Sequence, residues 1–394
     1  MNRYLTRVLA VAGFVVATAA GADPPKKAPP ADPPVVRSLS FSPDGSFLAA
    51  AVMPKDRGGL VIVWEVATRK PVAKYDRAGE SPIAAFATDG KSIVVANGRK
   101  LLPVLDPKTG EKTGEFGPLP SEVTALRPAG PGKWVTLGKD NTFRVWDEKE
   151  KKVAREFAGL KRVWGWAVSP GGKWLFANGD GTDKLWDLTT GDEAAGAFKP
   201  QPGRASAAVF LDEDRMLLGS NYGSHKVVEV PSGKEVLRFK NEGGTEGLAY
   251  SAAAGMMACR YYTDASIALT PLTFRPPTDA EKSRVSALLK ECDSDDFATR
   301  EKAAAALAEL GPAVEPLLKA ATTEGPSAEV RMRARVARET ILNKPKFRLT
   351  GHADEIRPAT FSPDGKVFAT GGADGQVILW DPATGKELGR LKAE

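Results

Sequence analysis

Histidine and cysteine are the side chains best suited to acid–base, nucleophilic or metal chemistry, and this sequence contains four of them: His225, His352, Cys259 and Cys292. Two histidines are too few for a zinc site of several histidines or for repeated histidine-based catalysis. The sequence also has no nucleophile elbow, no phosphate-cradling glycine loop and no acidic calcium loop of the expected spacing. We therefore predict that the protein is not an enzyme and holds no metal or cofactor.

A structural role is the alternative for these side chains. No motif places a nucleophile or carboxylate beside His225, and we predict that this residue lies in a solvated turn. The two cysteines fall in segments that belong to different predicted domains. A lone pair without a disulfide framework is typical of two buried thiols, and we expect no disulfide between them.

Residues 1–22 are typical of a secretory signal. Arg3 and Arg7 form a basic start, residues 8–17 are apolar, and small residues precede the expected cleavage before Asp23. The apolar run of about a dozen residues is shorter than the roughly 20 that cross a bilayer. We therefore expect export to the periplasm or the extracellular space, and no membrane span in the mature chain.

A proline-rich linker, residues 23–34, follows the signal, because a segment that is half proline favours extended conformations and cannot bury a core. The formal net charge is +6, and loss of the two signal arginines leaves 53 basic and 49 acidic residues, or +4. These charges alternate in sign, as in DEKEKKVARE at residues 147–156. Nucleic-acid binders concentrate basic residues on one face, so we expect no nucleic-acid partner.

An internal repeat organises the rest of the chain. FSPDG at residues 41–45 recurs at 361–365, and weaker copies end at Gly90, Gly132, Gly172, Asp214 and Gly255. The first six turns are 40 to 45 residues apart, and a step of 110 residues leads to the seventh. An apolar residue, usually followed by an acid, comes 14 or 15 residues after the later turns, at Leu105, Trp146, Trp186, Val228, Leu269 and Trp380.

A third mark lies about ten residues further on, at Tyr75, Phe116, Phe157, Phe198, Phe239 and Leu391. The segments between the marks are short runs of apolar and β-branched residues separated by Gly, Asp and Pro. Four such strands in a unit of about 42 residues are the pattern of a propeller blade. The seven units therefore predict an all-β ring of seven blades.

The last unit, GHADEIRPATFSPDGKVFATGGADGQVILWD at residues 351–381, resembles a WD repeat. The resemblance covers residues 35–394 apart from one insertion. It is strong in units one, three, four and seven and faint in two, five and six. It implies a seven-bladed WD-repeat β-propeller that serves as a platform for protein interaction.

The long step of 110 residues indicates an insertion, residues 275–345. Leu269 keeps its normal distance from the preceding turn, whereas the fourth strand of unit six, KFRLT at 346–350, appears only after the extra residues. The insertion therefore lies between the third and fourth strands of blade six. The predicted domains are the signal, 1–22; the linker, 23–34; blades one to six in part, 35–274; the insertion, 275–345; and the end of blade six with blade seven, 346–394.

The insertion has the composition of amphipathic helices, at residues 279–293, 295–312 and 327–343. Phe297, Ala304, Leu307 and Leu310 form an apolar stripe, with Asp295 as the expected N-cap. Residues 295–320 resemble one HEAT-type helical repeat. Such repeats normally stack to bury their faces, so either the propeller flank or a partner has to cover this small all-α, HEAT-like insertion.

The resemblance also implies a role for the second histidine. In similar WD repeats a His, a Ser or Thr, an Asp and the Trp form a buried hydrogen-bond chain, here His352, Thr370, Asp374 and Trp380. No other blade has the Gly-His pair, which predicts weaker bracing in the other blades. A buried polar side chain needs such partners, and the role of His352 is therefore structural.

In WD-repeat propellers, certain positions surround the face where the central channel is widest, and the residues at these positions are candidates for partner binding. Entries to first strands and turns between second and third strands supply Arg37, Trp164, Arg357, Tyr222, Tyr261 and Tyr262. Exposed aromatic residues and arginines make good interface anchors, although core packing is an equal alternative for each of them. On the last inserted helix, Arg331, Arg335 and Arg338 share a face that could meet an acidic partner, and a plain solvated face is the alternative.

The sequence as a whole predicts an exported, non-catalytic, monomeric WD-repeat scaffold that binds a protein partner. One alternative is a propeller enzyme or a carbohydrate-binding protein of the cell envelope, which requires several carboxylates at the channel mouth. Another is a surface structural module whose helical insert binds the partner. Unit one begins with its own first strand near Val36, and unit seven ends with its own fourth strand, LGRLK, so we expect no strand-swapped latch.

Overall fold

The computed structural model describes residues 33–55, 58–98, 100–179, 181–194, 205–240, 243–261 and 266–393, which belong to one compact unit. The predicted signal, all but the last two residues of the predicted linker, Phe198 and Tyr262 lie outside the described residues. None of the described helices is long and apolar enough to cross a membrane.

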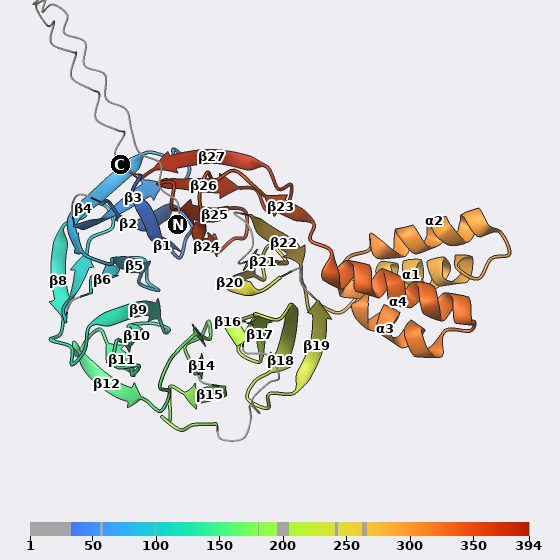
Figure 1. Ribbon diagram of the computed structural model, residues 1–394, viewed down its shortest axis with the longest axis horizontal. Coiled ribbons are helices and arrows are strands. Elements are labelled where there is room, and N and C mark those ends of the chain that lie inside the picture. Colours follow the sequence, from blue (N-terminus) through green and yellow to red (C-terminus); the bar gives the residue numbers. More distant parts are fainter. Residues whose placement is uncertain are drawn as a thin grey trace, which may run out of the picture. The chain divides into compact units, whose positions relative to one another are not determined.

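Seven antiparallel sheets, called blades one to seven, follow one another along the chain and form a ring (Figure 1). Blade one contains β1 (Val35–Phe41), β2 (Phe47–Met53), β3 (Gly59–Glu65) and β4 (Pro71–Gly79). Blade two contains β5 (Ile83–Phe86), β6 (Ile93–Ala96), β7 (Leu102–Leu105) and β8 (Lys112–Phe116). Blade three contains β9 (Val123–Pro128), β10 (Lys133–Gly138), β11 (Phe143–Asp147) and β12 (Lys152–Phe157).

The remaining blades follow the same order. Blade four contains β13 (Gly165–Val168), β14 (Trp174–Gly179) and β15 (Thr182–Asp187) within the described residues. Blade five contains β16 (Ala205–Phe210), β17 (Arg215–Ser220), β18 (Ser224–Glu229) and β19 (Glu235–Lys240). Blade six contains β20 (Thr245–Ser251), β21 (Met256–Tyr261), β22 (Ile267–Pro271) and β23 (Phe347–Leu349). Blade seven contains β24 (Ile356–Phe361), β25 (Phe368–Gly372), β26 (Gln376–Trp380) and β27 (Glu387–Lys392).

The repeated turn is held by its own side chains. In the first copy, the backbone N–H of Ser46 donates to Asp44 Oδ1 at 3.0 Å and that of Phe47 donates to Ser42 Oγ at 2.9 Å. Gly45 has a φ of 74°, in the left-handed region that glycine adopts without strain. The copy in blade seven has the same two types of hydrogen bond. This local chemistry explains why the turn is visible in the sequence as a repeated phrase.

The core lies between the blades, because both faces of each sheet are covered. In β2, Leu48 and Ala50 pack in a cluster with blade seven, whereas Ala49 and Ala51 pack in a cluster with blade two. Successive side chains of a strand point to opposite faces, so such a strand is apolar at every position. A cluster of this kind fills each of the seven interfaces between neighbouring blades.

Blades one and seven meet without a shared sheet, as expected from the absence of a latch strand. Among the described residues, each sheet contains only strands that are consecutive in the sequence, and β27 pairs with β26 of its own blade. The contact between the two blades is a side-chain cluster that includes Val36 and Leu60 from blade one and Val377 and Leu391 from blade seven. Figure 1 shows β1 and β24 side by side near the centre of the ring.

We expect hydrogen exchange to show that the interface between blades one and seven opens before the other blade interfaces. Every other pair of neighbouring blades is also joined by the chain, which keeps the two blades close after a local opening, whereas blades one and seven are held by packing alone. Under native conditions, the amides of β1 and β24 should therefore exchange faster than those of β9 in blade three. Equal protection of all seven blades would contradict this prediction.

Four helices and a short 3₁₀ turn lie between β22 and β23. They are α1 (Asp279–Glu291), α2 (Phe297–Ala308), η1 (Pro312–Val314), α3 (Glu315–Glu324) and α4 (Ala328–Asn343). They share a core that includes Leu288, Leu307, Leu318 and Ile341. The N-cap of α2 is Asp296, which accepts from Thr299 N at 2.8 Å, so the expected cap, Asp295, was wrong by one residue.

The ring flank covers one end of this helical insert. Leu342 of α4 belongs to the apolar cluster between blades five and six, and the backbone N–H of Lys240 donates to Asn343 Oδ1 at 2.8 Å. Phe297, predicted in the apolar stripe, is 64% exposed, because α2 begins there and the residue lies outside the insert's core. The propeller therefore supplies part of the cover that the insert needs.

Candidate functional site

The second histidine lies in a chain of hydrogen bonds that crosses blade seven. His352 Nδ1 lies 3.0 Å from Asp374 Oδ1, and its Nε2 lies 2.9 Å from Thr370 Oγ1. Trp380 Nε1 donates to the same hydroxyl oxygen at 2.9 Å. Burial pushes the pKa of Asp374 upward, but the backbone N–H of Ala353 and the imidazole outweigh that effect and hold the pKa below its ordinary value. Each of the four side chains in this hydrogen-bond chain has a hydrogen-bond partner, and the arrangement braces the blade.

Blade three contains a reduced version of this chain. Trp146 Nε1 donates to Thr136 Oγ1 at 3.0 Å, as in blade seven. Blade three has no histidine in the chain, and the carboxylate of Asp140 instead accepts from Arg144 Nη2 at 2.7 Å. Glu156 accepts from Nε of the same arginine at 2.7 Å. Blade three therefore has the Trp–Thr bond but lacks the link between the hydroxyl and the aspartate.

His225 is fully buried, so its predicted place in a solvated turn was wrong. The residue is in β18, where side chains alternate between the two faces, and it shares with Val227 the face toward blade six. Its Nε2 lies 3.1 Å from Thr245 Oγ1 and 3.6 Å from Cys259 Sγ, both in blade six. The phenyl ring of Phe239 packs against the imidazole at 5.2 Å between ring centroids.

This Cys–His contact is electrostatically unsuited to nucleophilic chemistry. Burial lowers the pKa of His225 to about 4, and burial raises the pKa of the Cys259 thiol to about 12, against the opposing effect of its hydrogen bonds. At neutral pH the pair is therefore a neutral imidazole and a neutral thiol, whereas a nucleophilic cysteine needs a thiolate. Both cysteines are free and buried, as predicted.

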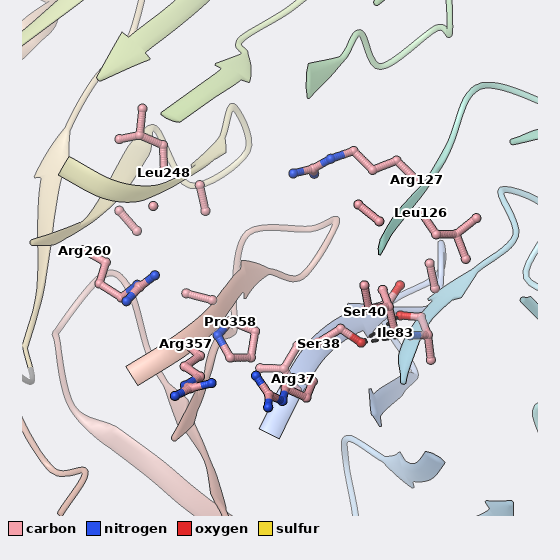
Figure 2. Close-up of a pocket in the computed structure, with 18 of the residues that line it drawn as sticks. Arg37, Ser38, Ser40, Ile83, Leu126, Arg127, Leu248, Arg260, Arg357 and Pro358 are labelled. Atoms are coloured by element: carbon pink, nitrogen blue, oxygen red, sulfur yellow. Dashed lines mark hydrogen bonds between the residues drawn. The ribbon is translucent and has the colours of Figure 1, made fainter. Parts of the chain in front are cut away.

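A cavity of about 390 Å³ lies on the ring axis (Figure 2). It is lined by the first strands of blades one, two, three, four, six and seven, together with residues of β21 and β22. The lining includes four arginines, from four different blades: Arg37, Arg127, Arg260 and Arg357. No aspartate or glutamate is among the described residues that line it. The channel wall therefore combines apolar side chains with positive charge.

Two of these arginines have acidic partners at the cavity edge. Arg260 forms ion pairs with Glu246 and, at 3.5 Å, with Glu355. Arg357 Nη2 lies 3.1 Å from Glu355 Oε2. These pairs fix the two guanidinium groups and partly neutralise them.

The structure describes five of the six residues predicted on the channel face, all but Tyr262, and places them differently. Arg37 and Arg357 line the cavity. Tyr222 is 74% exposed in the turn between β17 and β18. Trp164 is partly buried and does not line the cavity, whereas Trp166, two residues further on, does. Tyr261 lies in β21 and not in the predicted turn, and it is buried against Cys259 and Ala268, in agreement with core packing, the alternative given for it.

The three arginines predicted on the helical insert are mostly engaged within it. Arg331 Nη1 donates to the carbonyl oxygen of Gly325 at 2.7 Å, and Arg338 Nε donates to Glu315 Oε1 at 2.6 Å. Only Arg335 of the three is exposed. These contacts favour the interpretation of an ordinary solvated helix face over a basic docking face.

Sequence reasoning missed Arg127, Arg260 and Trp166. Aligning the units at their repeated turns would have indicated the first of them, because Arg127 precedes Gly132 by five residues, as Ser40 precedes Gly45. Equivalent positions on inner strands face the channel, so a charged residue at such a position points to the site. The second-strand position of Arg260 gives no comparable signal.

A ring of antiparallel, sequence-consecutive blades around an axial cavity defines the chain as a repeat β-propeller. The family model for the WD domain, G-beta repeat, matches residues 30–65, 152–187 and 343–381. The second match runs from β12 of blade three to β15 of blade four, and the third runs to β26 of blade seven. The protein therefore carries WD repeats and has the fold of a seven-bladed WD-repeat propeller. The model does not match β9, β10 and β11 of blade three, although the resemblance was expected to be strong in this unit.

Several relatives resemble part or most of this chain. Telomerase protein component 1 of Rattus norvegicus is 23% identical over 363 residues, 88% of this chain and 12% of that protein. Small ribosomal subunit protein RACK1z of Arabidopsis thaliana is 49% identical over 45 residues, 11% of this chain and 14% of that protein. WD repeat-containing protein 1 of Xenopus tropicalis is 44% identical over 46 residues, 12% of this chain and 8% of that protein. The chain thus spans less than a sixth of each of these relatives.

Proposed function

We propose that the protein is an exported, non-catalytic and monomeric WD-repeat scaffold that binds a protein partner at the mouth of its central channel. The observation that carries this proposal is the group of four arginines, contributed by four blades, around a cavity whose described lining has no carboxylate. Arginines and exposed aromatic residues are the usual anchors of protein interfaces. Entries to first strands and turns between second and third strands share one face, so Tyr222 belongs to the same face as Arg37 and Arg357.

The enzyme and carbohydrate-binding alternatives have less support. Both require carboxylates that converge on the channel, and Glu246 and Glu355 are instead paired with the lining residues Arg260 and Arg357. The Cys–His contact in blades five and six is neutral and buried, and it offers no reactive group to a substrate. A binding role therefore agrees best with the chemistry of the described residues.

The insert-centred alternative has one supporting feature and one opposing feature. Met332 and Val336 are exposed on α4, 45% and 53% respectively, and they lie one turn apart. The arginines that were expected to attract an acidic partner are largely engaged by neighbouring residues of the insert. We therefore place the partner on the ring.

Export rests on residues 1–22, which have a basic start, an apolar run of about a dozen residues and a small-residue end. Fractionation of the producing cell, together with N-terminal sequencing of the purified protein, tests this part of the proposal. We expect the protein in the periplasmic or extracellular fraction, beginning at Asp23. Recovery of the intact chain from the cytoplasm would contradict it.

Crosslinking and mass spectrometry in the producing cell test the partner site. The double charge reversal Arg37→Glu, Arg357→Glu should lower recovery of the partner by about tenfold or more, because it turns two interface cations into anions. Deletion of residues 275–345, with β22 joined to β23 by a short turn, should leave recovery of the partner unchanged. The reversal Arg284→Glu, Lys302→Glu, at exposed positions of the insert, is the charge-matched control.

Two outcomes would overturn this placement. Loss of the partner on deletion of the insert, with a folded ring by circular dichroism, would assign the interaction to the helices. Equal recovery with the ring reversal and with the control reversal would show that the channel mouth does not bind the partner.

A further inference from the structure

The charges around the channel do not balance. Arg37, Arg127, Arg260 and Arg357 contribute four positive charges, whereas Glu246 and Glu355 contribute two negative charges at the cavity edge. Arg37 and Arg127 have no ion pair or hydrogen bond to another described residue. Neither guanidinium group is therefore paired with a carboxylate of the described part of the chain. Glu80 and Glu122 line a neighbouring pocket with Arg37, but Glu122 is paired with Lys139 and neither carboxylate forms an ion pair with Arg37.

Arg127 is held in position within this cavity. Its guanidinium carbon lies 4.8 Å from the ring centroid of Trp166, a cation–π contact that orients the side chain but leaves its N–H donors free. Figure 2 shows the side chain extending from β9 into the cavity, on the side opposite Arg260. The side chain is exposed to the cavity space, yet the channel walls surround it, and this desolvation lowers its pKa.

An anion that enters the channel can pair with Arg127, whose N–H donors have no hydrogen-bond acceptor among the described residues. Guanidinium groups bind carboxylates and phosphates through pairs of parallel N–H···O bonds, which are among the stronger hydrogen bonds in proteins. A cavity of about 390 Å³ has room for a few side chains of an extended peptide and is too small for a folded domain.

We propose that the channel receives an acidic segment of the partner protein, with one carboxylate bound by Arg127 inside the channel and another bound by Arg37 at the mouth. This inference rests on the proposed function and adds the chemistry of the partner. Arg37 and Arg127 come from blades one and three, which are separated by blade two, so the positive charge is spread around the wall. Spread charge matches carboxylates spaced along a chain better than the concentrated charge of one phosphate group.

Binding of a defined peptide tests the proposal with the purified full chain. The probe is a fluorescein-labelled octapeptide of alternating glutamate and serine, and the control peptide replaces each glutamate with glutamine. Fluorescence anisotropy should show binding of the acidic peptide only. This binding should weaken between 50 mM and 500 mM salt, because screening reduces attraction between charges at an accessible site.

Substitutions locate the binding. Arg127→Gln should weaken binding of the acidic peptide by about tenfold or more, and Arg37→Gln should weaken it by a smaller factor. Arg284→Gln, which removes the same charge from an exposed position of α1, should change it by less than about twofold. Arg127→Lys should restore part of the affinity, since the charge returns without the planar fork. Circular dichroism establishes that each variant is folded, and if Arg127→Gln does not fold, Arg37→Gln carries the test.

Three results would overturn the proposal. One is equal affinity of the wild-type protein for the acidic peptide and the glutamine peptide. Another is equal affinity of Arg127→Gln and Arg284→Gln for the acidic peptide. The last is displacement of the peptide by inorganic phosphate at a concentration at which acetate has no effect, which would assign the cavity to a single phosphate group.

The crosslinking experiment separates this inference from the proposed function. If Arg37→Glu, Arg357→Glu abolishes recovery of the partner while the acidic peptide does not bind, the scaffold function stands and the acidic character of the partner is wrong. If the peptide binds through Arg127 but the ring reversal leaves the partner in place, the channel binds anions and the proposed partner site is wrong.

Discussion

Acidification from about pH 7 to about pH 4 should cost the folded protein about 3 kcal/mol through His225 alone. Burial lowers the pKa of this histidine from 6.5 to about 4 in the folded state. As the pH falls below 6.5, the unfolded chain binds a proton at this residue and the folded chain does not. The stability is therefore complete above pH 6.5 and declines until the pH reaches about 4.

Denaturant unfolding at several pH values, compared between wild type and His225→Gln, isolates this contribution. Carboxylates such as Asp374, whose pKa is also lowered in the folded state, destabilise both proteins equally on acidification. The difference between the two curves should shrink by about 3 kcal/mol between neutral pH and about pH 4. Parallel curves would mean that His225 takes up a proton in the folded state as readily as in the unfolded chain.

Replacing Thr370 by valine should destabilise the protein by about 4 kcal/mol, twice the effect of the same change at Thr136. Valine keeps the shape of threonine, so neither substitution creates a cavity, and each removes a hydroxyl group. In blade seven this leaves two buried groups without a partner, Trp380 Nε1 and His352 Nε2. In blade three it leaves one, Trp146 Nε1, because no histidine reaches Thr136.

The two substitutions in one protein control for each other. Thr370 and Thr136 are both buried, with exposed fractions of 0% and 1%, and each lies beside the tryptophan of its blade. Free energies of unfolding from urea titrations at neutral pH are the measurement, with equal m-values required for the comparison. Equal losses for Thr370→Val and Thr136→Val would show that the histidine link adds nothing to the bracing of blade seven.

Several features of this protein follow from the sequence alone because they are local. The turn at Gly45 and Gly365 depends on Ser and Asp side chains one to three residues away, so its recurrence gives the blade spacing directly. The position of the insertion follows from the number of residues between Leu269 and the strand at Phe347–Leu349, which is far larger than the spacing of third and fourth strands in the other units. The members of the hydrogen-bond chain around Thr370 lie within one repeat, at the separations that the WD pattern sets.

Other features were decided by the tertiary structure. Burial at a blade interface depends on side chains from two neighbouring blades, and the sequence does not show which of them face each other. His225 is buried by Thr245 and Cys259, 20 and 34 residues away in the next blade, and no local pattern around it reports their presence. Tyr261 is buried at the end of the strand that carries Cys259. The channel site has the same origin, since its four arginines come from blades one, three, six and seven, and only the closing of the ring brings them to one cavity.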